Sequence, residues 1–276
     1  MTPDRPMLLE IEHLSKTYGS GADATEAIRS IDLAIEEREF VSVVGPSGCG
    51  KTTLLKCMSG LLDATSGEVR LRGRPLTGTP EDMALVFQEY GRSLFPWMTV
   101  RDNIRLPLKH KQLGKAETTA LVEDAVEAVG LSGFIDRYPW QLSGGMQQRV
   151  AIARALAYQP AILLMDEPFA SVDAQTRADL EDLTLDLRRR YGMTILFVTH
   201  DIDESVYIGD RVVVLSRPPT TVKEELAVDL PEPRDQVRTK EHAEFARLRA
   251  RIYTLIKRGA ASGDRADAAV AGEAAS

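Results

Sequence analysis

The sequence has few of the residues that mark disulfide-stapled or metal-rich proteins. Only two cysteines occur among 276 residues, at Cys49 and Cys57, so neither a disulfide framework nor a cysteine metal site is predicted. The four histidines are widely separated and form no ligand-spaced cluster; they are His13, His110, His200 and His242.

A basic excess and long apolar runs are also absent. The chain has 34 basic and 41 acidic side chains and a formal net charge of −7, which disfavours nucleic acid as a partner. No apolar run approaches the roughly 20 residues that span a bilayer, and residues 1–10 lack a signal-peptide layout. We therefore expect a cytoplasmic chain, with enough hydrophobic residues (43%) to bury a core.

The most informative stretch is Gly45 to Thr53 (GPSGCGKTT), which fits the phosphate-loop pattern G-x-x-x-x-G-K-[ST]. The apolar run Phe40 to Val44 before it predicts a buried strand, and Leu54-Leu55 after it continue a helix. Backbone N–H groups of the loop can surround an anion, Lys51 can reach the β and γ phosphates, and the Thr52 hydroxyl can ligate magnesium. A chance glycine turn is the alternative, which the flanks make rare.

The hydrophobic pattern predicts an α/β chain. Alternating apolar positions near 9–11 and 31–35 predict an antiparallel flap. Further strands are expected at Gly67 to Arg72, Met83 to Phe87, Ala161 to Met165, Thr194 to Thr199, Arg211 to Leu215 and Val222 to Val228, and helices at 117–129, 174–190 and 241–257. No strand pattern occurs between about 90 and 160, so this span is predicted to be a helical insertion into the α/β core.

A second helix start that is suited to bind an anion, besides the one after the phosphate loop, is predicted inside the insertion, in the segment Leu142 to Arg149 (LSGGMQQR). Ser143 is suited to cap the helix that follows. Glycine costs about 0.8–1 kcal/mol relative to alanine in a helix, so Gly144 and Gly145 are better explained by close backbone approach than by helix stability. A simple capped turn is the alternative.

Several polar residues follow predicted strands, where ligands gather in parallel sheets. Asp166 and Glu167 end one strand and are suited to bind magnesium and to orient or deprotonate water; a solvated turn is the alternative. His200 ends another strand and Gln88 a third, although a lone histidine is usually structural. Tyr18 offers a ring for adenine stacking, or it is a partly buried core tyrosine.

An apolar cluster of Phe95, Trp97 and Met98 lies in a tract with no clear strand or helix to bury it. It predicts a surface for a partner helix, with packing inside the helical insertion as the alternative.

The order and spacing of these segments resemble the ATP-binding subunit of an ABC transporter over residues 7 to about 230. The residues that carry the resemblance are GPSGCGKTT, Gln88, LSGGMQQR, ILLMDEP at 162–168, SVD at 171–173 and His200. LSGGMQQR is the specific segment, because phosphate loops occur in many NTPases. Within the family, residues 90–104 and 229–239 look most like importer subunits for nitrate, aliphatic sulfonates and taurine.

The resemblance implies a P-loop NTPase core with a mostly parallel sheet, an antiparallel β flap and a helical subdomain at about 90–160. The ATPase domain would span 7–258, between a flexible start (1–6) and a disordered tail (259–276). ATP would contact Tyr18, Gly45, Pro46, Ser47, Gly48, Cys49, Gly50, Lys51, Thr52 and Thr53, and, from the second subunit, Ser143, Gly144, Gly145, Gln147 and Asp173. Magnesium would be held by Thr52, Gln88 and Asp166, and catalysis would involve Glu167, His200, Gln88 and Lys51.

The implied partners are a second ATP-binding subunit, which makes a homodimer around two ATP molecules, and permease subunits at the cytoplasmic face of the membrane. A solute-binding protein would act indirectly. The rival functions are a non-transport ABC ATPase that acts as a mechanical clamp and a P-loop kinase, the latter leaving LSGGMQQR unexplained.

Overall fold

The computed structural model describes residues 5–88 and 93–257, and the chain divides into two compact units. Unit 1 comprises residues 1–36, 40–78 and 198–276, and unit 2 comprises 37–39 and 79–197. The predicted tail 259–276 and most of the predicted flexible start lie outside the described residues. The predicted boundaries of the ATPase domain and of its helical subdomain stay predictions.

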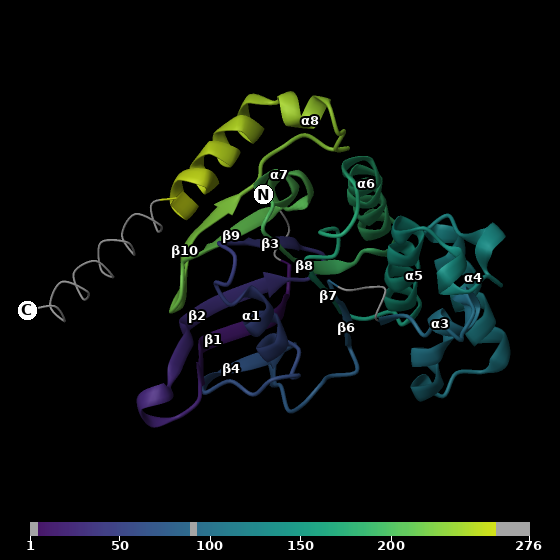
Figure 1. The fold of residues 1–276 in the computed structure, drawn as a ribbon, viewed down its shortest axis with the longest axis horizontal. Helices are drawn as coiled ribbons and strands as arrows, with labels where there is room; N and C mark the ends of the chain where they lie inside the picture. Colours follow the sequence, from purple (N-terminus) through teal and green to yellow (C-terminus); the bar gives the residue numbers. More distant parts are fainter. Residues whose placement is uncertain (1–4, 89–92, 258–276) are drawn as a thin grey trace, which may run out of the picture. The chain divides into compact units, whose positions relative to one another are not determined.

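Unit 1 is built on a mixed sheet with the strand order β5-β4-β1-β2-β10-β9-β3 (Figure 1). Strand β1 pairs antiparallel with both β2 and β4, which confirms the predicted flap, whereas β3 runs parallel to β9. The strands are β1 (Met7–Tyr18), β2 (Thr25–Glu36), β3 (Phe40–Val44), β4 (Ser66–Leu71), β5 (Arg74–Pro75), β9 (Arg211–Leu215) and β10 (Thr220–Ala227).

The helices of unit 1 are η1 (Gly21–Asp23), α1 (Lys51–Met58), α7 (Ile202–Ile208), α8 (Arg238–Glu241) and a last helix at 243–257. Of these, sequence reasoning missed η1, α7 and α8. The last helix lies along β10 (Figure 1), where Arg251 forms an ion pair with Glu224 at 2.6 Å and Lys223 Nζ donates to the carbonyl of Leu255 at 2.8 Å.

Unit 2 carries strands in the order β8-β7-β6, with β6 (Met83–Val86) parallel to β7 (Ile162–Asp166). Strand β8 (Thr194–Thr199) ends with two residues that belong to unit 1. Between β6 and β7 the described residues contain helices and no strand, as predicted. The helices of unit 2 are α3 (Val100–Arg105), η2 (Leu106–Lys111), α4 (Lys115–Ala128), η3 (Ser132–Phe134), η4 (Pro139–Gln141), α5 (Gly144–Ala157) and α6 (Ala174–Tyr191).

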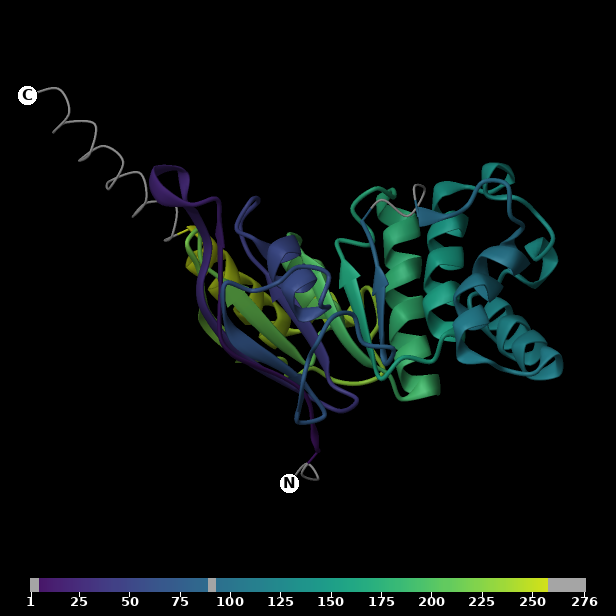
Figure 2. The same cartoon turned by 90° about the horizontal axis from the view of Figure 1, so that it is seen from below.

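Helix α5 is central to unit 2, because α3, α4 and α6 all contact it (Figure 2). Its apolar side chains, such as Val150 and Ile152, are buried, and so are Ile104 of α3 and Val126 of α4. Thr99 caps α3 by accepting the N–H of Asp102. None of the helices in the described ranges is both long and apolar enough to cross a membrane.

Candidate functional site

The phosphate loop follows β3, which is buried along its whole length. Gly50 caps α1 in the left-handed region (φ 90°) and, as a glycine, makes no side-chain cap there. A Cβ on Gly45 would lie 2.8 Å from Cys49 Sγ, and Gly48 also has a positive φ of 73°. The glycines therefore allow a tight loop whose backbone amides, at the positive end of a helix, suit an anion.

The ammonium group of Lys51 is held inside this loop. Its side chain is 5% exposed, and Nζ donates to the carbonyls of Gly45 and Pro46 at 3.1 Å each. Ser47 and Thr52, by contrast, are exposed. The loop thus holds the buried positive charge of Lys51 and exposes the hydroxyl groups of Ser47 and Thr52.

A buried threonine far along the sequence forms a hydrogen bond with the phosphate loop. Thr220, the first residue of β10, is fully buried and its hydroxyl donates to the carbonyl of Cys49. Sequence reasoning missed this residue, because 171 positions separate the two partners and no local pattern marks the pair.

Tyr18 lies beside the start of α1. Its hydroxyl shares a hydrogen bond of 3.2 Å with that of Thr53, and the side chain is 42% exposed. Lys16 Nζ lies 5.3 Å from the ring centroid, within the range of a cation–π contact. Tyr18 is therefore not enclosed in the core, and much of its side chain is accessible to solvent.

His200 follows β8 and is exposed. The turn that carries it is fixed by side chains: the Asp201 N–H donates to Thr199 Oγ1 at 3.0 Å, and Asp201 Oδ1 accepts the Glu204 N–H at 3.1 Å. The Thr199 hydroxyl also donates to the buried Glu204 carboxylate. This network starts α7 and leaves the imidazole facing outward on a rigid turn.

In unit 2, three predicted site residues lie at one edge of the sheet. Val86 pairs with Met165, so Gln88 after β6 and the Asp166-Glu167 pair at the end of β7 leave the same edge. Asp166 is 5% exposed, and Glu167 has a positive φ of 44°. Such a conformation costs a non-glycine residue about 1–3 kcal/mol and is typical of functional sites.

The segment at Ser143 is a helix start, as predicted, and Ser143 and Gly144 are exposed. Ser143 caps α5 by accepting the Met146 N–H at 3.3 Å. A Cβ on Gly145 would lie 2.4 Å from Thr176 Cγ2, so the close approach predicted for this glycine comes at least in part from α6. Gln147 Nε2 donates to the carbonyls of Pro139 (3.0 Å) and Leu142 (3.3 Å).

Thr176 links this segment to Asp173. Asp173 caps α6, since its carboxylate accepts the Thr176 N–H at 3.0 Å and the Thr176 hydroxyl at 2.7 Å. These two hydrogen bonds, the backbone one foremost, lower the pKa of Asp173. Thr176 thus lies against both Asp173 and Gly145.

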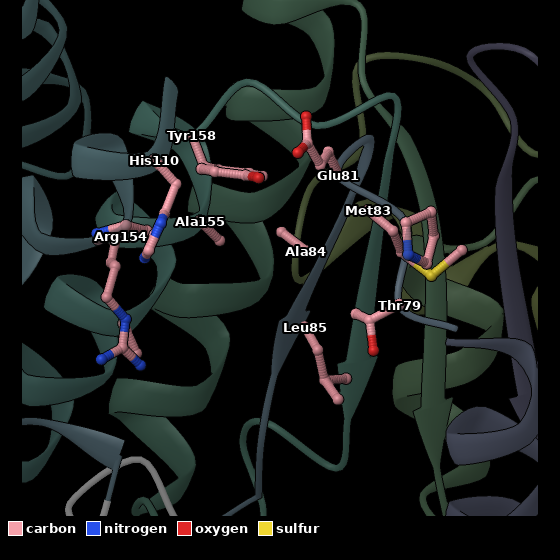
Figure 3. Close-up of a pocket in the computed structure, with 12 residues that line it drawn as sticks. Thr79, Glu81, Met83, Ala84, Leu85, His110, Arg154, Ala155 and Tyr158 are labelled. Carbon is pink, nitrogen blue, oxygen red and sulfur yellow. The ribbon is translucent and has the colours of Figure 1, made fainter. Parts of the chain in front are cut away.

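A cavity of about 430 Å³ lies between β6 and α5 (Figure 3). Figure 3 shows Ala84 and Leu85 of β6 on one side and Arg154 and Ala155 of α5 on the other. Burial lowers the pKa of Arg154, whose guanidinium donates to the backbone carbonyl (2.7 Å) and hydroxyl (2.9 Å) of Ser93.

The predicted docking cluster begins two residues after Ser93. The rings of Phe95 and Trp97 are 5.4 Å apart, and Trp97 is 70% exposed, whereas Phe95 and Met98 are half-buried. Asn103 of α3 holds the cluster by accepting the Phe95 N–H at 2.8 Å. Packing inside the helical insertion therefore accounts for part of the cluster and not for Trp97.

The comparisons with known proteins match most of the chain. The family described as ABC transporter matches residues 28–170. The chain is 44% identical to the aliphatic sulfonates import ATP-binding protein SsuB of Bacillus licheniformis, over 83% of this chain and 88% of SsuB. It is 41% identical to the nitrate import ATP-binding protein NrtD of Synechocystis sp., over 91% of this chain and 96% of NrtD.

A solved structure extends the likeness to three dimensions. It is a dimeric ATP-binding cassette in a post-hydrolysis state, bound to ADP and phosphate. It matches with a TM-score of 0.70 and 33% identity, over 80% of this chain and 99% of that one. The predicted α/β fold of the P-loop NTPase class is confirmed.

Proposed function

Given that this chain belongs to the ABC transporter family and is an ATPase, we propose that it drives solute import through a permease, bound peripherally at the cytoplasmic face of the membrane. The observation that carries the proposal is that one chain has two helix starts suited to an anion, at Lys51 and at Ser143. Relatives named for sulfonate and nitrate import support the direction of transport.

ATP binds at the phosphate loop in this proposal. The loop amides from Gly45 to Thr53 contact the phosphates, and the Lys51 ammonium, already inside the loop, neutralises charge on the β and γ groups. The adenine stacks on the exposed ring of Tyr18.

The residues also suit magnesium, which prefers oxygen ligands and usually binds through one or two protein groups plus phosphates. Thr52 offers a hydroxyl, Asp166 a buried carboxylate and Gln88 an amide oxygen. When bound, the ion would neutralise charge that develops on the phosphoryl oxygens.

Hydrolysis needs a group that positions and deprotonates water. Glu167 takes that role, because its strained backbone holds the carboxylate just beyond Asp166. General base catalysis contributes about 10²–10⁴-fold. His200, facing outward on its fixed turn, contacts the γ phosphate.

Two copies of the chain complete the sites. Each phosphate loop would face Ser143, Gly144, Gly145, Gln147 and Asp173 of the partner, so a homodimer holds two ATP molecules. The dimeric cassette with bound ADP and phosphate supports this arrangement.

The permease contact is proposed at the exposed Trp97 and its neighbours Phe95 and Met98. The Arg154–Ser93 hydrogen bonds attach the residue two positions before this cluster to the wall of the cavity beside β6. Ala84 and Leu85 of that wall would give a partner helix an apolar surface.

The solute is proposed to be nitrate, a sulfonate or a taurine-like compound, delivered by a solute-binding protein. Overall identity does not choose among these, because SsuB (44%) and NrtD (41%) are about equally similar and are named for different solutes. Growth of a deletion strain on each compound as the sole nitrogen or sulfur source decides the solute, and normal growth on all of them contradicts this choice.

The dimer is tested with Glu167→Gln, which keeps the size of the side chain and removes the carboxylate that accepts the proton. ATP should bind and persist, and size-exclusion chromatography should show a monomer without ATP and a dimer with it.

Ser143→Arg, added to the Glu167→Gln chain, tests the interface, because it places bulk and charge at the exposed Ser143. It should abolish the ATP-dependent dimer. A dimer that is indifferent to both ATP and the arginine would refute the composite site.

A further inference from the structure

An exposed aromatic pair lies just before the segment at Ser143. Trp140 is 70% exposed and Tyr138 is 38% exposed. Their rings stack with centroids 5.9 Å apart and planes only 10° from parallel. One face of the indole is thereby supported by a protein ring, and most of the side chain remains accessible, an arrangement typical of a recognition surface.

The turn that carries the pair is rigid. Trp140 lies in η4, where Gln141 and Tyr138 exchange two hydrogen bonds of 2.9 Å, one through the Gln141 side chain. Gln147 on α5 donates to the carbonyl of Pro139, which is buried. The indole is therefore presented by a turn tied directly to the first turns of α5.

We propose that Trp140 stacks on the purine base of the nucleotide held by the phosphate loop of a second copy of this chain, and that Gln147 is a positioning residue that fixes the turn bearing it. The inference rests on the proposed dimer. It adds a base contact supplied by the partner, which the segment at Ser143 does not provide.

The position of Trp140 suits this role. It precedes Ser143 by three residues, which span at most about 10 Å of chain. A triphosphate and a ribose separate a γ phosphate from its base by a similar length. If Ser143 meets the γ phosphate, the indole therefore lies within a nucleotide's length of that phosphate, close enough for stacking on the base.

The chemistry favours a purine. Stacking on an aromatic ring uses the π face of a base, and the larger purine face gives the larger contact. Tyr18 of one copy and Trp140 of the other would then cover opposite faces of one adenine. Trp140 becomes a residue that favours ATP over CTP.

The first test uses fluorescence. The chain has two tryptophans, so Trp97→Phe leaves Trp140 as the single one. In the Glu167→Gln, Trp97→Phe protein, ATP should change Trp140 emission over the same range of ATP concentration that forms the dimer. CTP at that concentration should not.

The second test measures the ATP concentration for half-maximal dimer formation in the Glu167→Gln background. Trp140→Ala should raise it about tenfold and Trp140→Phe less, since a phenyl ring retains part of the stacking. Trp140→Ala should also reduce the ratio between the CTP and ATP concentrations that give half-maximal dimer formation. Trp97→Ala is the matched control, because Trp97 is equally exposed and the isolated subunit carries no permease.

The role of Gln147 is tested in the same assay. Gln147→Ala should weaken ATP-dependent dimer formation more in the Trp140 protein than in the Trp140→Ala protein, because any loss from its own place beside the nucleotide occurs in both and the loss of indole placement only in the first. Equal effects in both backgrounds would show that Gln147 acts independently of the indole.

The outcomes separate this inference from the proposed function. A dimer that forms with ATP but has the same midpoint in Trp140→Ala and Trp97→Ala overturns the stacking role alone. Failure of Glu167→Gln to dimerise overturns the composite site and the inference with it.

Discussion

Gly145→Ala tests whether the packing of α6 explains the glycine at the start of α5. The added Cβ would lie 2.4 Å from Thr176 Cγ2, more than 1 Å inside the contact distance of about 3.5–4.0 Å. Thr176 cannot turn away without loss, because its hydroxyl donates to Asp173 at 2.7 Å. Either the two helices separate or that hydrogen bond breaks.

The magnitude follows from two opposing terms. Overpacking of this kind costs about 1–3 kcal/mol. Alanine in place of glycine contributes up to about 0.8–1.0 kcal/mol of helix stability. Gly145→Ala should therefore lower the free energy of unfolding, by up to about 2 kcal/mol.

Thr176→Ser provides the matched background, because it removes Cγ2 and keeps the hydroxyl that bonds Asp173. In that background Gly145→Ala should become neutral or stabilising, since only the helix term remains. The coupling between the two changes is then about 1–3 kcal/mol.

The assay is urea unfolding of the four proteins, compared at their midpoints with the slopes checked for equality. If Gly145→Ala has the same effect in both backgrounds, contact with Thr176 does not explain the glycine. The requirement for glycine would then lie in the nucleotide contact proposed for this segment.

Two further predictions concern the anchors of the loops. Thr220→Val should lower the free energy of unfolding by about 1–3 kcal/mol and weaken ATP binding, because it removes the hydroxyl that donates to the buried Cys49 carbonyl. Thr220→Ser keeps that hydroxyl and should retain both stability and ATP binding. Equal unfolding midpoints for the valine and serine variants would contradict this. The lowered pKa of Asp173 means that its contribution to stability is full above the ordinary value of 3.8 and is lost as the pH falls through the lower folded-state value. Asp173→Asn, which can still cap α6, should flatten that acid-side decline in an unfolding series from pH 6 to about 2, and an unchanged slope would show that other carboxylates cause it.

The sequence predicts well those features that short-range physics determines. The bounds of β3 match the predicted apolar run Phe40 to Val44, because the glycine of the phosphate loop ends the run. The helix expected through Leu54 and Leu55 is α1. The caps at Thr99 and Ser143 were likewise predictable, since each acceptor and its amide lie three residues apart.

Long-range contacts escaped prediction. The Thr220 anchor of the phosphate loop and the contact of Thr176 with Gly145 join residues far apart in sequence, which no local periodicity encodes. Helix α7 was missed because its seven residues are too few for a 3.6-residue period to be evident. Phe87, expected inside a buried strand, lies beyond the end of β6 and is 42% exposed.

The two carbonyls that hold Lys51 have a consequence for turnover. Two of the three ammonium protons already have acceptors at 3.1 Å, so a phosphate that recruits them replaces existing hydrogen bonds instead of meeting a bare charge. Only the difference between the two sets of bonds adds to affinity. The same carbonyls recapture the ammonium group as the phosphate departs, which lowers the barrier to product release. An ATPase that must release ADP in every cycle benefits from a loop whose lysine already has hydrogen-bond acceptors when the nucleotide is gone.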